Sequence, residues 1–276
     1  MRPPFAAGSF YPESKDELVK LIDLLFKQVD ASKVKEAEKG IAFVAPHAGY
    51  IYSGYVAAYT YLAIAERVKK TGLSTFVIIG PDHNGSGDFV NVSLDDFETP
   101  LGVAKNDRKL SELISGFDKR FSTSKEEIAE EHSVEVQIPF LQRLFPQAQF
   151  CFICMTDQSI EASKIVSNAI DHASGKLGRD VLVIASSDFD HYEPASVAES
   201  KDMPAIHALE RLDELGFNKQ LAASGDTACG YGAITSALLF AKGRGATKGL
   251  LLKYGNSGEA TKDYSSVVAY ASIAFL

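Results

Sequence analysis

Residues 75–85 read TFVIIGPDHNG, an unbroken run of apolar side chains that passes directly into a polar turn containing His83. A strand with one face in water alternates polar and apolar residues, whereas a strand covered on both faces reads as a continuous apolar run. The run therefore predicts a strand in the interior of a sheet, with helices packed on both of its faces.

Two other stretches repeat this pattern: IAFVAPHAGY at 41–50 and VLVIASSDFDHY at 181–192. The expected strands are 41–45, 75–80, 89–93, 149–155, 180–186, 249–254 and 266–274. The expected helices are 15–28, 55–70, 134–144, 160–174, 196–212 and 231–242. Strands that alternate with helices indicate βαβ units. We therefore expect an α/β fold with a mixed, mainly parallel central sheet flanked by helices, in a single domain over residues 1–276.

The composition of the 276-residue chain narrows its class. It is 46% hydrophobic and 23% charged, with a formal net charge of −8. Duplex-binding surfaces carry a basic excess, so nucleic acid is not expected as a partner. Three cysteines do not suggest a disulfide framework. No secretory signal is recognisable at the start, and no apolar run approaches the roughly 20 residues that span a bilayer. We expect a cytoplasmic chain without membrane contact.

Histidines follow three of the expected strands. His47 lies in APHAGY, His83 in GPDHNG, and His191 with Asp188 in SSDFDHY. In open α/β sheets, ligands bind at the carboxyl ends of the strands, so these turns are expected to converge on one cleft. Neutral imidazole is the commonest nitrogen ligand of metal ions. The pattern predicts a metal-binding cleft, although each turn read alone is equally typical of an ordinary strand end.

The third ligand decides the kind of metal. Two histidines and a carboxylate are typical of non-haem Fe(II), whereas a thiolate favours softer metals such as zinc or Cu(I). Cys229, in DTACGYGA ahead of an expected helix, is a candidate because a helix N-terminus favours the thiolate. The alternative is that Cys229 is a small buried apolar residue, as most free cysteines are.

Other polar residues have weaker claims to the cleft. His132, in EEHSVEVQ near Glu131, could bind an anion, relay protons or line the cleft; it could also be an ordinary surface histidine. His191 and Asp188 could form an acid–base pair, or merely hold a strand-end turn. Ser186 or Ser187 with His191 and Asp188 would make a hydrolase, but triad members usually come from separate segments.

Several other features do not predict sites. Cys151 and Cys154 lie three apart in an expected strand, so they point to opposite faces and do not easily share one metal ion. His172 and His207 fall in the middle of expected helices. Neither a dinucleotide-binding fingerprint nor a Walker A sequence is present.

Motifs along nearly the whole chain resemble those of the Memo family, whose microbial members are called AmmeMemoRadiSam system protein B. The motifs are RPPFAAGSFYP (2–12), APHAGYIYSG (45–54), GPDHNG (80–85), EEHSVEVQIPFLQ (130–142), SSDFDHY (186–192), DTACGYGAI (226–234) and YSSVVAYASIAF (264–275). That family is similar in fold to the class III (LigB-type) extradiol dioxygenases, which open catechol rings with non-haem Fe(II).

The resemblance implies specific roles for residues of this chain. His47, His83 and Cys229 match the family's two-histidine, one-cysteine pocket, and His132, Asp188 and His191 match its other pocket residues. The redox role described in the family implies iron or copper as the metal ion, and the thiolate also allows zinc; no nucleotide is expected. The partners implied are a radical-SAM protein and an AMMECR1-type protein. A cysteine replaces the dioxygenase carboxylate, so ring cleavage does not carry over. Asp82, where relatives often carry a small hydroxyl residue, could strengthen cation binding or act as an alternative ligand.

Two main hypotheses follow. In the first, the chain is a metal-binding protein with a dioxygenase-like cleft and redox activity. In the second, the cleft has lost its metal and recognises a peptide or a partner protein.

Overall fold

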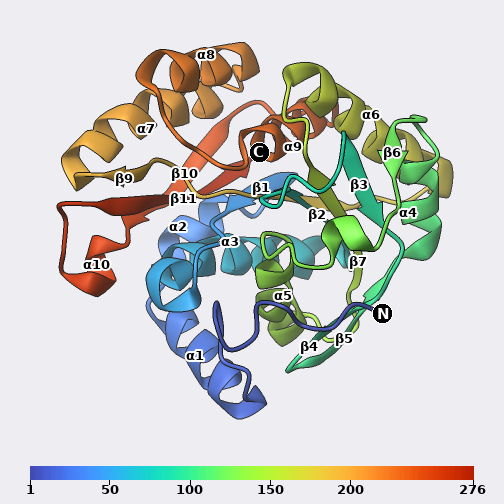
Figure 1. Cartoon of the computed structure of the whole chain (residues 1–276), viewed down its shortest axis with the longest axis horizontal. Helices are drawn as coiled ribbons and strands as arrows, with labels where there is room; N and C mark the ends of the chain where they lie inside the picture. The colour runs from blue at the N-terminus through green and yellow to red at the C-terminus, as the bar shows by residue number, and fades with distance from the viewer.

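The computed structural model describes all residues 1–276 and is built around one mixed sheet (Figure 1). Its main strand order is β10-β11-β1-β8-β2-β7-β3-β6, with β4, β5 and β9 paired to its margins. The strands are β1 (Ala42–Ala45), β2 (Thr75–Pro81), β3 (Val90–Ser93), β4 (Phe97–Thr99), β5 (Gly102–Asn106), β6 (Phe121–Ser122), β7 (Gln149–Met155), β8 (Leu182–Ser186), β9 (His191–Glu193), β10 (Gly249–Asn256) and β11 (Val267–Phe275).

The four central strands β1, β8, β2 and β7 are parallel, and antiparallel strands flank them. Ala45 pairs with Ser186 and Pro81 with Met155, so the central strands end close to one line. The segments that follow them therefore emerge at one edge of the sheet, where the candidate site residues lie. The expected mixed α/β fold is confirmed, with the parallel pairing concentrated at its centre.

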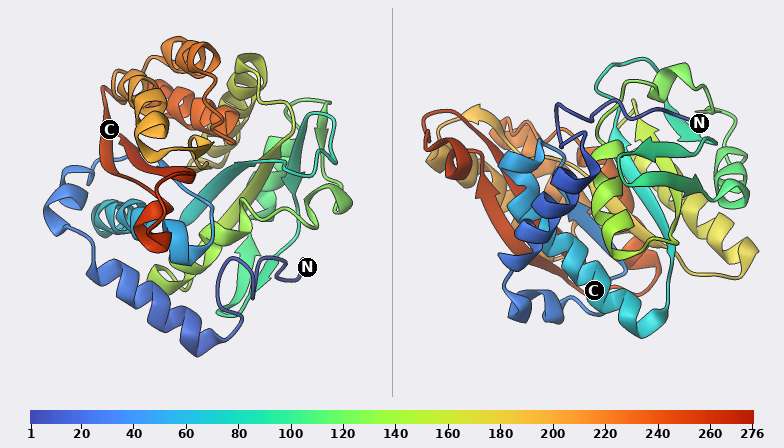
Figure 2. Two further views of the ribbon diagram at one scale, coloured as in Figure 1. Left: turned by 60° about the vertical axis from the view of Figure 1, so that its left-hand side comes forward. Right: turned by 90° about the horizontal axis from the view of Figure 1, so that it is seen from below.

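Helices cover both faces of the sheet (Figures 1 and 2). They are α1 (Lys15–Lys27), α2 (Ala31–Glu36), α3 (Tyr50–Thr71), α4 (Arg108–Ser115), α5 (Ile138–Leu144), α6 (Ile160–Leu177), α7 (Ala195–Glu210), α8 (Glu214–Ser224), α9 (Tyr231–Gly243) and α10 (Gly258–Thr261), with 3₁₀ turns η1 (Glu126–Ile128) and η2 (Glu135–Gln137). None of these helices is long and apolar enough to cross a membrane.

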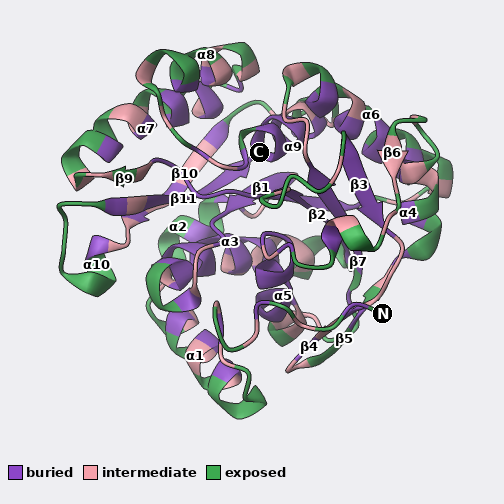
Figure 3. Cartoon of the chain, viewed as in Figure 1, coloured by how far each residue is buried: buried purple, intermediate pink, exposed green.

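The central strands are buried (Figure 3), and the alternation of their side chains divides the core into two clusters. Val77 and Ile79 of β2 belong to the cluster beneath α6 and α9, whereas Phe76 and Ile78 belong to the cluster beneath α1, α3 and α5. Cys151 and Cys154 likewise fall in different clusters, both buried. The expectation that these two cysteines point to opposite faces is confirmed, and it excludes them as joint metal ligands.

The expected elements are present with small shifts, and two helices differ more. Helix α3 begins at Tyr50 instead of residue 55 and runs through Gly54, where an added Cβ would lie 2.6 Å from the Leu25 side chain. The expected helix 134–144 is a 3₁₀ turn followed by α5. The elements not predicted are all short: α2, α4, α8, α10, η1, β4, β5, β6 and β9.

Candidate metal centre

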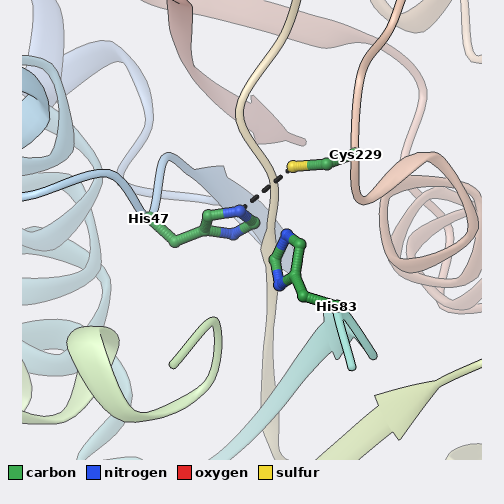
Figure 4. Close-up of side chains that lie close together, drawn as sticks. All are labelled: His47, His83 and Cys229. Atoms are coloured by element: carbon green, nitrogen blue, oxygen red, sulfur yellow. Dashed lines mark hydrogen bonds between the residues drawn. The ribbon is translucent and has the colours of Figure 1, made fainter. Parts of the chain in front are cut away.

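The structure brings His47, His83 and Cys229 together at the carboxyl edge of the central strands. His47 follows β1, His83 follows β2, and Cys229 lies in the loop that leads into α9. One ligand atom from each residue lies within 4.8 Å of the other two. Cys229 Sγ is 3.0 Å from His47 Nε2, and the imidazole rings of His47 and His83 meet edge to face with centroids 5.0 Å apart (Figure 4).

Asp188, just after β8, ties the segments of this site together. Its Oδ1 accepts the backbone N–H groups of His47 at 2.8 Å and Ala48 at 3.3 Å. Its carbonyl oxygen accepts the N–H of Cys229 at 3.3 Å. Glycine is needed at position 230, because a Cβ there would lie 2.4 Å from the carbonyl oxygen of Ser186. The loop 225–230, called the cysteine loop below, can therefore pass directly over the end of β8.

Glu131 fixes the second histidine from a fully buried position. Its carboxylate accepts the backbone N–H of His83 at 2.6 Å, His83 Nδ1 at 3.0 Å and the N–H of Ser133 at 2.7 Å. Burial opposes its charge, but these hydrogen bonds and the charge of His83 lower the pKa of Glu131 to about 2. Burial also opposes a charge on His83, yet Glu131 raises the pKa of His83 above its ordinary value.

The other two imidazoles near the site are neutral at pH 7. Burial, and next the charge of His83, lowers the pKa of His47 to about 3. Burial, and next the proximity of His47, lowers the pKa of His132 to about 3. A neutral imidazole is the form that binds a metal ion, so His47 is ready to act as a ligand without losing a proton.

The state of Cys229 differs from the expectation of a helix N-terminal thiolate. Although part of the side chain is accessible, burial and then the nearby Asp188 carboxylate raise the pKa of the thiol above its ordinary value. Desolvation therefore outweighs the effect of the following helix. The thiol is protonated in the metal-free protein and would lose its proton on binding a metal ion.

His132 lies beside the site, stacked between two other rings. Its ring centroid is 4.3 Å from that of Phe10 and 4.5 Å from that of His83. Neither ring nitrogen has a hydrogen-bond partner, and the nearest carboxylate oxygen, on Glu131, is 3.6 Å away. His83, Glu131 and His132 form a second group of possible ligands, but the Glu131 carboxylate is already taken by three N–H donors.

Phe10 reaches the site because residues 2–11 of the amino-terminal segment are held in place by contacts with Glu135. This buried carboxylate forms an ion pair with Arg2 and accepts hydrogen bonds from the Ala6 N–H at 2.8 Å and from the Tyr11 hydroxyl. The contribution of Phe10 was not predicted. The clustering of three aromatic residues in the opening motif was the available signal.

Asp188 and His191 are not joined by a hydrogen bond, so of the two alternatives for these residues the hydrogen bonds fit the strand-end turn. The Asp188 Oδ1 is engaged by the backbone of His47 and Ala48. His191 donates its backbone N–H to Thr227 Oγ1 at 2.8 Å, and its Nδ1 lies 3.5 Å from the same oxygen. His191 is thus held by the cysteine loop.

The serine hydrolase hypothesis does not fit the hydrogen bonds. Ser186 contacts His47 and not His191, while the Ser187 hydroxyl donates to the carbonyl oxygen of Asp188. Both serines are buried. Neither is therefore placed as a nucleophile that a substrate could reach.

Asp82 stabilises a turn and does not join either group of possible ligands. Its Oδ1 accepts the N–H of Asn84 at 3.0 Å, and its Oδ2 accepts the N–H of Gly87 at 3.1 Å and the Thr156 hydroxyl at 2.9 Å. Asp82 is therefore not placed as a ligand in either group, although its charge helps to raise the pKa of His83.

A cavity of about 570 Å³ adjoins Cys229. Part of its wall is formed by the side chains of Leu221, Ala222 and Tyr231. The polar residues Asn218, Asp226 and Thr227 also line it. A small organic molecule would fit in this volume beside Cys229, whereas His47 and His83 do not line the cavity.

Comparisons with known proteins agree with the motifs. The model of the family described as Memo-like protein matches residues 2–274. Similar proteins include MEMO1 family proteins of Methanosarcina barkeri, 40% identical over 99% of both chains, and Methanopyrus kandleri, 37% identical over 99% of this chain and 98% of that protein. The uncharacterized protein JW3007 of Escherichia coli K12 aligns over 84% of this chain and 98% of its own with a TM-score of 0.48 and 12% identity. The family model and the 37–40% identity to the two MEMO1 family proteins show that the chain belongs to the Memo-like family.

Proposed function

We propose that this chain binds iron or copper through His47, His83 and Cys229 and uses the ion in redox chemistry on a small molecule. The observation that carries the proposal is the convergence of three ligand atoms within 4.8 Å from three separate segments. Two imidazoles and a thiolate form a mixed nitrogen and sulfur set, which suits Cu(I), zinc or iron better than calcium or magnesium. A bound ion would supply Lewis acidity and electron transfer at the edge of the sheet.

The surrounding residues supply hydrogen-bonding groups and orientation. His132 is neutral and its ring nitrogens have no hydrogen-bond partner, so the ring is free to form a hydrogen bond with a ligand in the cleft. His191 is held through Thr227 and is a second imidazole beside the loop that carries Cys229. Asp188 orients His47 and Cys229 through their backbone groups. A dioxygenase-like fold motivates oxidation chemistry, but the cysteine in place of a carboxylate argues against ring cleavage.

Anaerobic titration of the whole chain with Fe(II), Cu(I) and Zn(II) tests the proposal. We expect His47→Ala and Cys229→Ala to weaken binding of the preferred ion at least about tenfold, since each removes one of three ligands. His207→Ala, on the exposed face of α7, is the matched control and should bind as wild type. Equal binding by wild type and His47→Ala would contradict the proposal.

A second candidate function is recognition of a peptide or a partner protein. Tyr192, 78% exposed next to His191, favours it because exposed aromatic side chains commonly anchor interfaces. Co-purification of radical-SAM and AMMECR1-type proteins from the source cell, with wild type, His132→Ala and His47→Ala, separates the two functions. Capture lost in His132→Ala but retained in His47→Ala would favour the binding function.

A further inference from the structure

The Ser186 hydroxyl, fully buried at the end of β8, makes every hydrogen bond it can. It lies 2.6 Å from the carbonyl oxygen of Ser133, 2.7 Å from Gln137 Nε2 and 3.0 Å from His47 Nδ1. A serine hydroxyl has one proton to donate and two lone pairs to accept with. A carbonyl oxygen only accepts, so the proton of Ser186 is directed to Ser133.

This leaves the hydroxyl oxygen as an acceptor for both of its other neighbours. Gln137 donates from Nε2, and His47 must then donate from Nδ1. A neutral imidazole carries one proton, so a proton on Nδ1 leaves Nε2 with a free lone pair. That lone pair is the one that faces Cys229 Sγ at 3.0 Å.

The orientation of Gln137 is set in the same way. Its Nε2 also lies 3.0 Å from the carbonyl oxygen of Pro46, which can only accept, and its Oε1 accepts the hydroxyl of Tyr61. Gln137 and Tyr61 are buried, so solvent does not compete for these groups. If the amide were reversed, Oε1 would face the carbonyl oxygen of Pro46 and the oxygen of Ser186, and neither could donate a proton to it. The amide therefore always presents a donor to Ser186.

His83 also carries its proton on Nδ1, but the acceptor that holds it there is a carboxylate and not a hydroxyl. Glu131 Oε1 lies 3.0 Å from His83 Nδ1, and the same carboxylate accepts the backbone N–H groups of His83 and Ser133, so it serves as the acceptor here too. His83 therefore also carries its proton on Nδ1, and its Nε2 is directed away from Glu131.

We infer that Ser186, Gln137 and Glu131 are positioning residues that hold both histidines with the proton on Nδ1, so that Nε2 of each is free for a ligand. The proposed metal site gives this arrangement its function, and to that extent the inference rests on it. The hydrogen-bond partner of one ring nitrogen decides that the other nitrogen binds the metal ion. The evidence for the inference is independent of the metal site: it is the assignment of hydrogen-bond donors and acceptors around Ser186 and Glu131. In water, neutral imidazole prefers the proton on the other nitrogen, so the arrangement must be imposed by the protein.

Ring ¹⁵N NMR of the whole metal-free chain tests the inference directly, because the two neutral forms have distinct patterns of nitrogen shifts and two-bond couplings. We expect His47 to carry its proton on Nδ1 near pH 7, and His83 to carry one there whether neutral or charged. In Ser186→Ala we expect the proton of His47 to move to Nε2. Ser272→Ala, which also removes a fully buried strand hydroxyl, is the matched control and should leave His47 unchanged. A wild-type His47 with its proton on Nε2 would overturn the inference.

Metal affinity gives an independent measurement that separates positioning from simple stability. Loss of such an outer partner typically weakens metal binding by about 10- to 100-fold. We expect that loss in Ser186→Ala and in Gln137→Met, little change in Ser272→Ala, and recovery in Ser186→Thr, which keeps the hydroxyl. Unchanged affinity in a folded Ser186→Ala would overturn the inference. If wild type binds no metal ion, the proposed function fails, and the NMR result alone still decides the proton positions.

Discussion

Cys229 Sγ lies 3.0 Å from His47 Nε2, although 182 residues separate them in the chain. The sulfur is protonated and the ring nitrogen is not, so the contact is a thiol donating to an imidazole. A metal ion that enters between them must replace this hydrogen bond with two coordinate bonds and release the thiol proton. The contact therefore marks where a ligand would bind and predicts a pH dependence.

Proton release on metal binding follows from these charge states. At pH 7, His47 is already neutral because its pKa is about 3, whereas Cys229 holds its proton because its pKa is raised. Binding of Zn(II) should release about one proton from Cys229, together with the fraction that His83 carries. Affinity should therefore rise with pH.

Calorimetry in buffers of different ionisation enthalpy measures this release. Cys229→Ala should release about one proton fewer than wild type. The same release by both proteins would show that the sulfur does not bind the ion.

The metal preference should change if the sulfur is replaced by a carboxylate. Cys229→Asp converts the ligand set to two histidines and one carboxylate, the arrangement of non-haem Fe(II) sites. We expect the affinity for Cu(I) to fall relative to that for Fe(II), measured by competition with chelators of known strength. Cys151→Asp is unsuitable as a control because that residue is in the core; Cys229→Ser is the better one, since it loses the thiolate without gaining a charge. An unchanged ratio of affinities would contradict the role of Cys229 as a ligand.

The sequence contained enough to place His47 and His83 at one edge, because continuous apolar runs identify buried parallel strands and polar turns follow them. It did not reveal that Glu131 binds His83, since 48 residues lie between them and no local pattern reports a long-range hydrogen bond. The sequence also left the role of Asp188 open, because its oxygen bonds to backbone groups, which carry no signal in the sequence.

Three of the missed helices did carry a local signal. Asp30, Asp107 and Asp213 precede α2, α4 and α8, and each accepts a backbone N–H of the first turn. Aspartate is a favoured residue at this position. These helices have only 6, 8 and 11 residues, so their hydrophobic periodicity is too short to identify them without the cap.

Removal of the Arg2 side chain should destabilise the fold and loosen the site. Arg2 and Glu135 form a buried ion pair, and Arg2→Met would leave the Glu135 charge without its counter-ion. Breaking a buried pair in this way typically costs about 3–5 kcal/mol. The free energy of unfolding, measured with denaturant, should fall by that order.

The double change Arg2→Met with Glu135→Gln should recover part of this loss, because it removes the unpaired charge. The matched surface control is Arg108→Met, whose partner Glu112 is 53% exposed; exposed pairs contribute about 0–1 kcal/mol. If Arg2→Met and Arg108→Met cost the same, the buried pair does not hold the amino-terminal segment.

Stability should also depend on pH through Asp202, a fully buried residue of α7. Burial, and then the neighbouring Asp226 carboxylate, raises the pKa of Asp202 to about 8. In the unfolded chain the same group ionises near its ordinary pKa of about 4. Between these values the folded state binds a proton that the unfolded state has lost, so stability falls as pH rises from about 4 to about 8 and changes no further above that.

Asp202→Asn removes this dependence, because an amide does not ionise and can still bond to the Tyr254 hydroxyl, which donates to Asp202 at 2.6 Å. We expect the variant to be more stable than wild type at pH 9 by on the order of a few kcal/mol, and close to wild type near pH 5. Denaturant unfolding at both pH values measures the difference, with Asp88→Asn on the surface as control. Parallel pH profiles for wild type and Asp202→Asn would mean that Asp202 ionises in the folded protein near its ordinary pKa, and they would contradict this prediction.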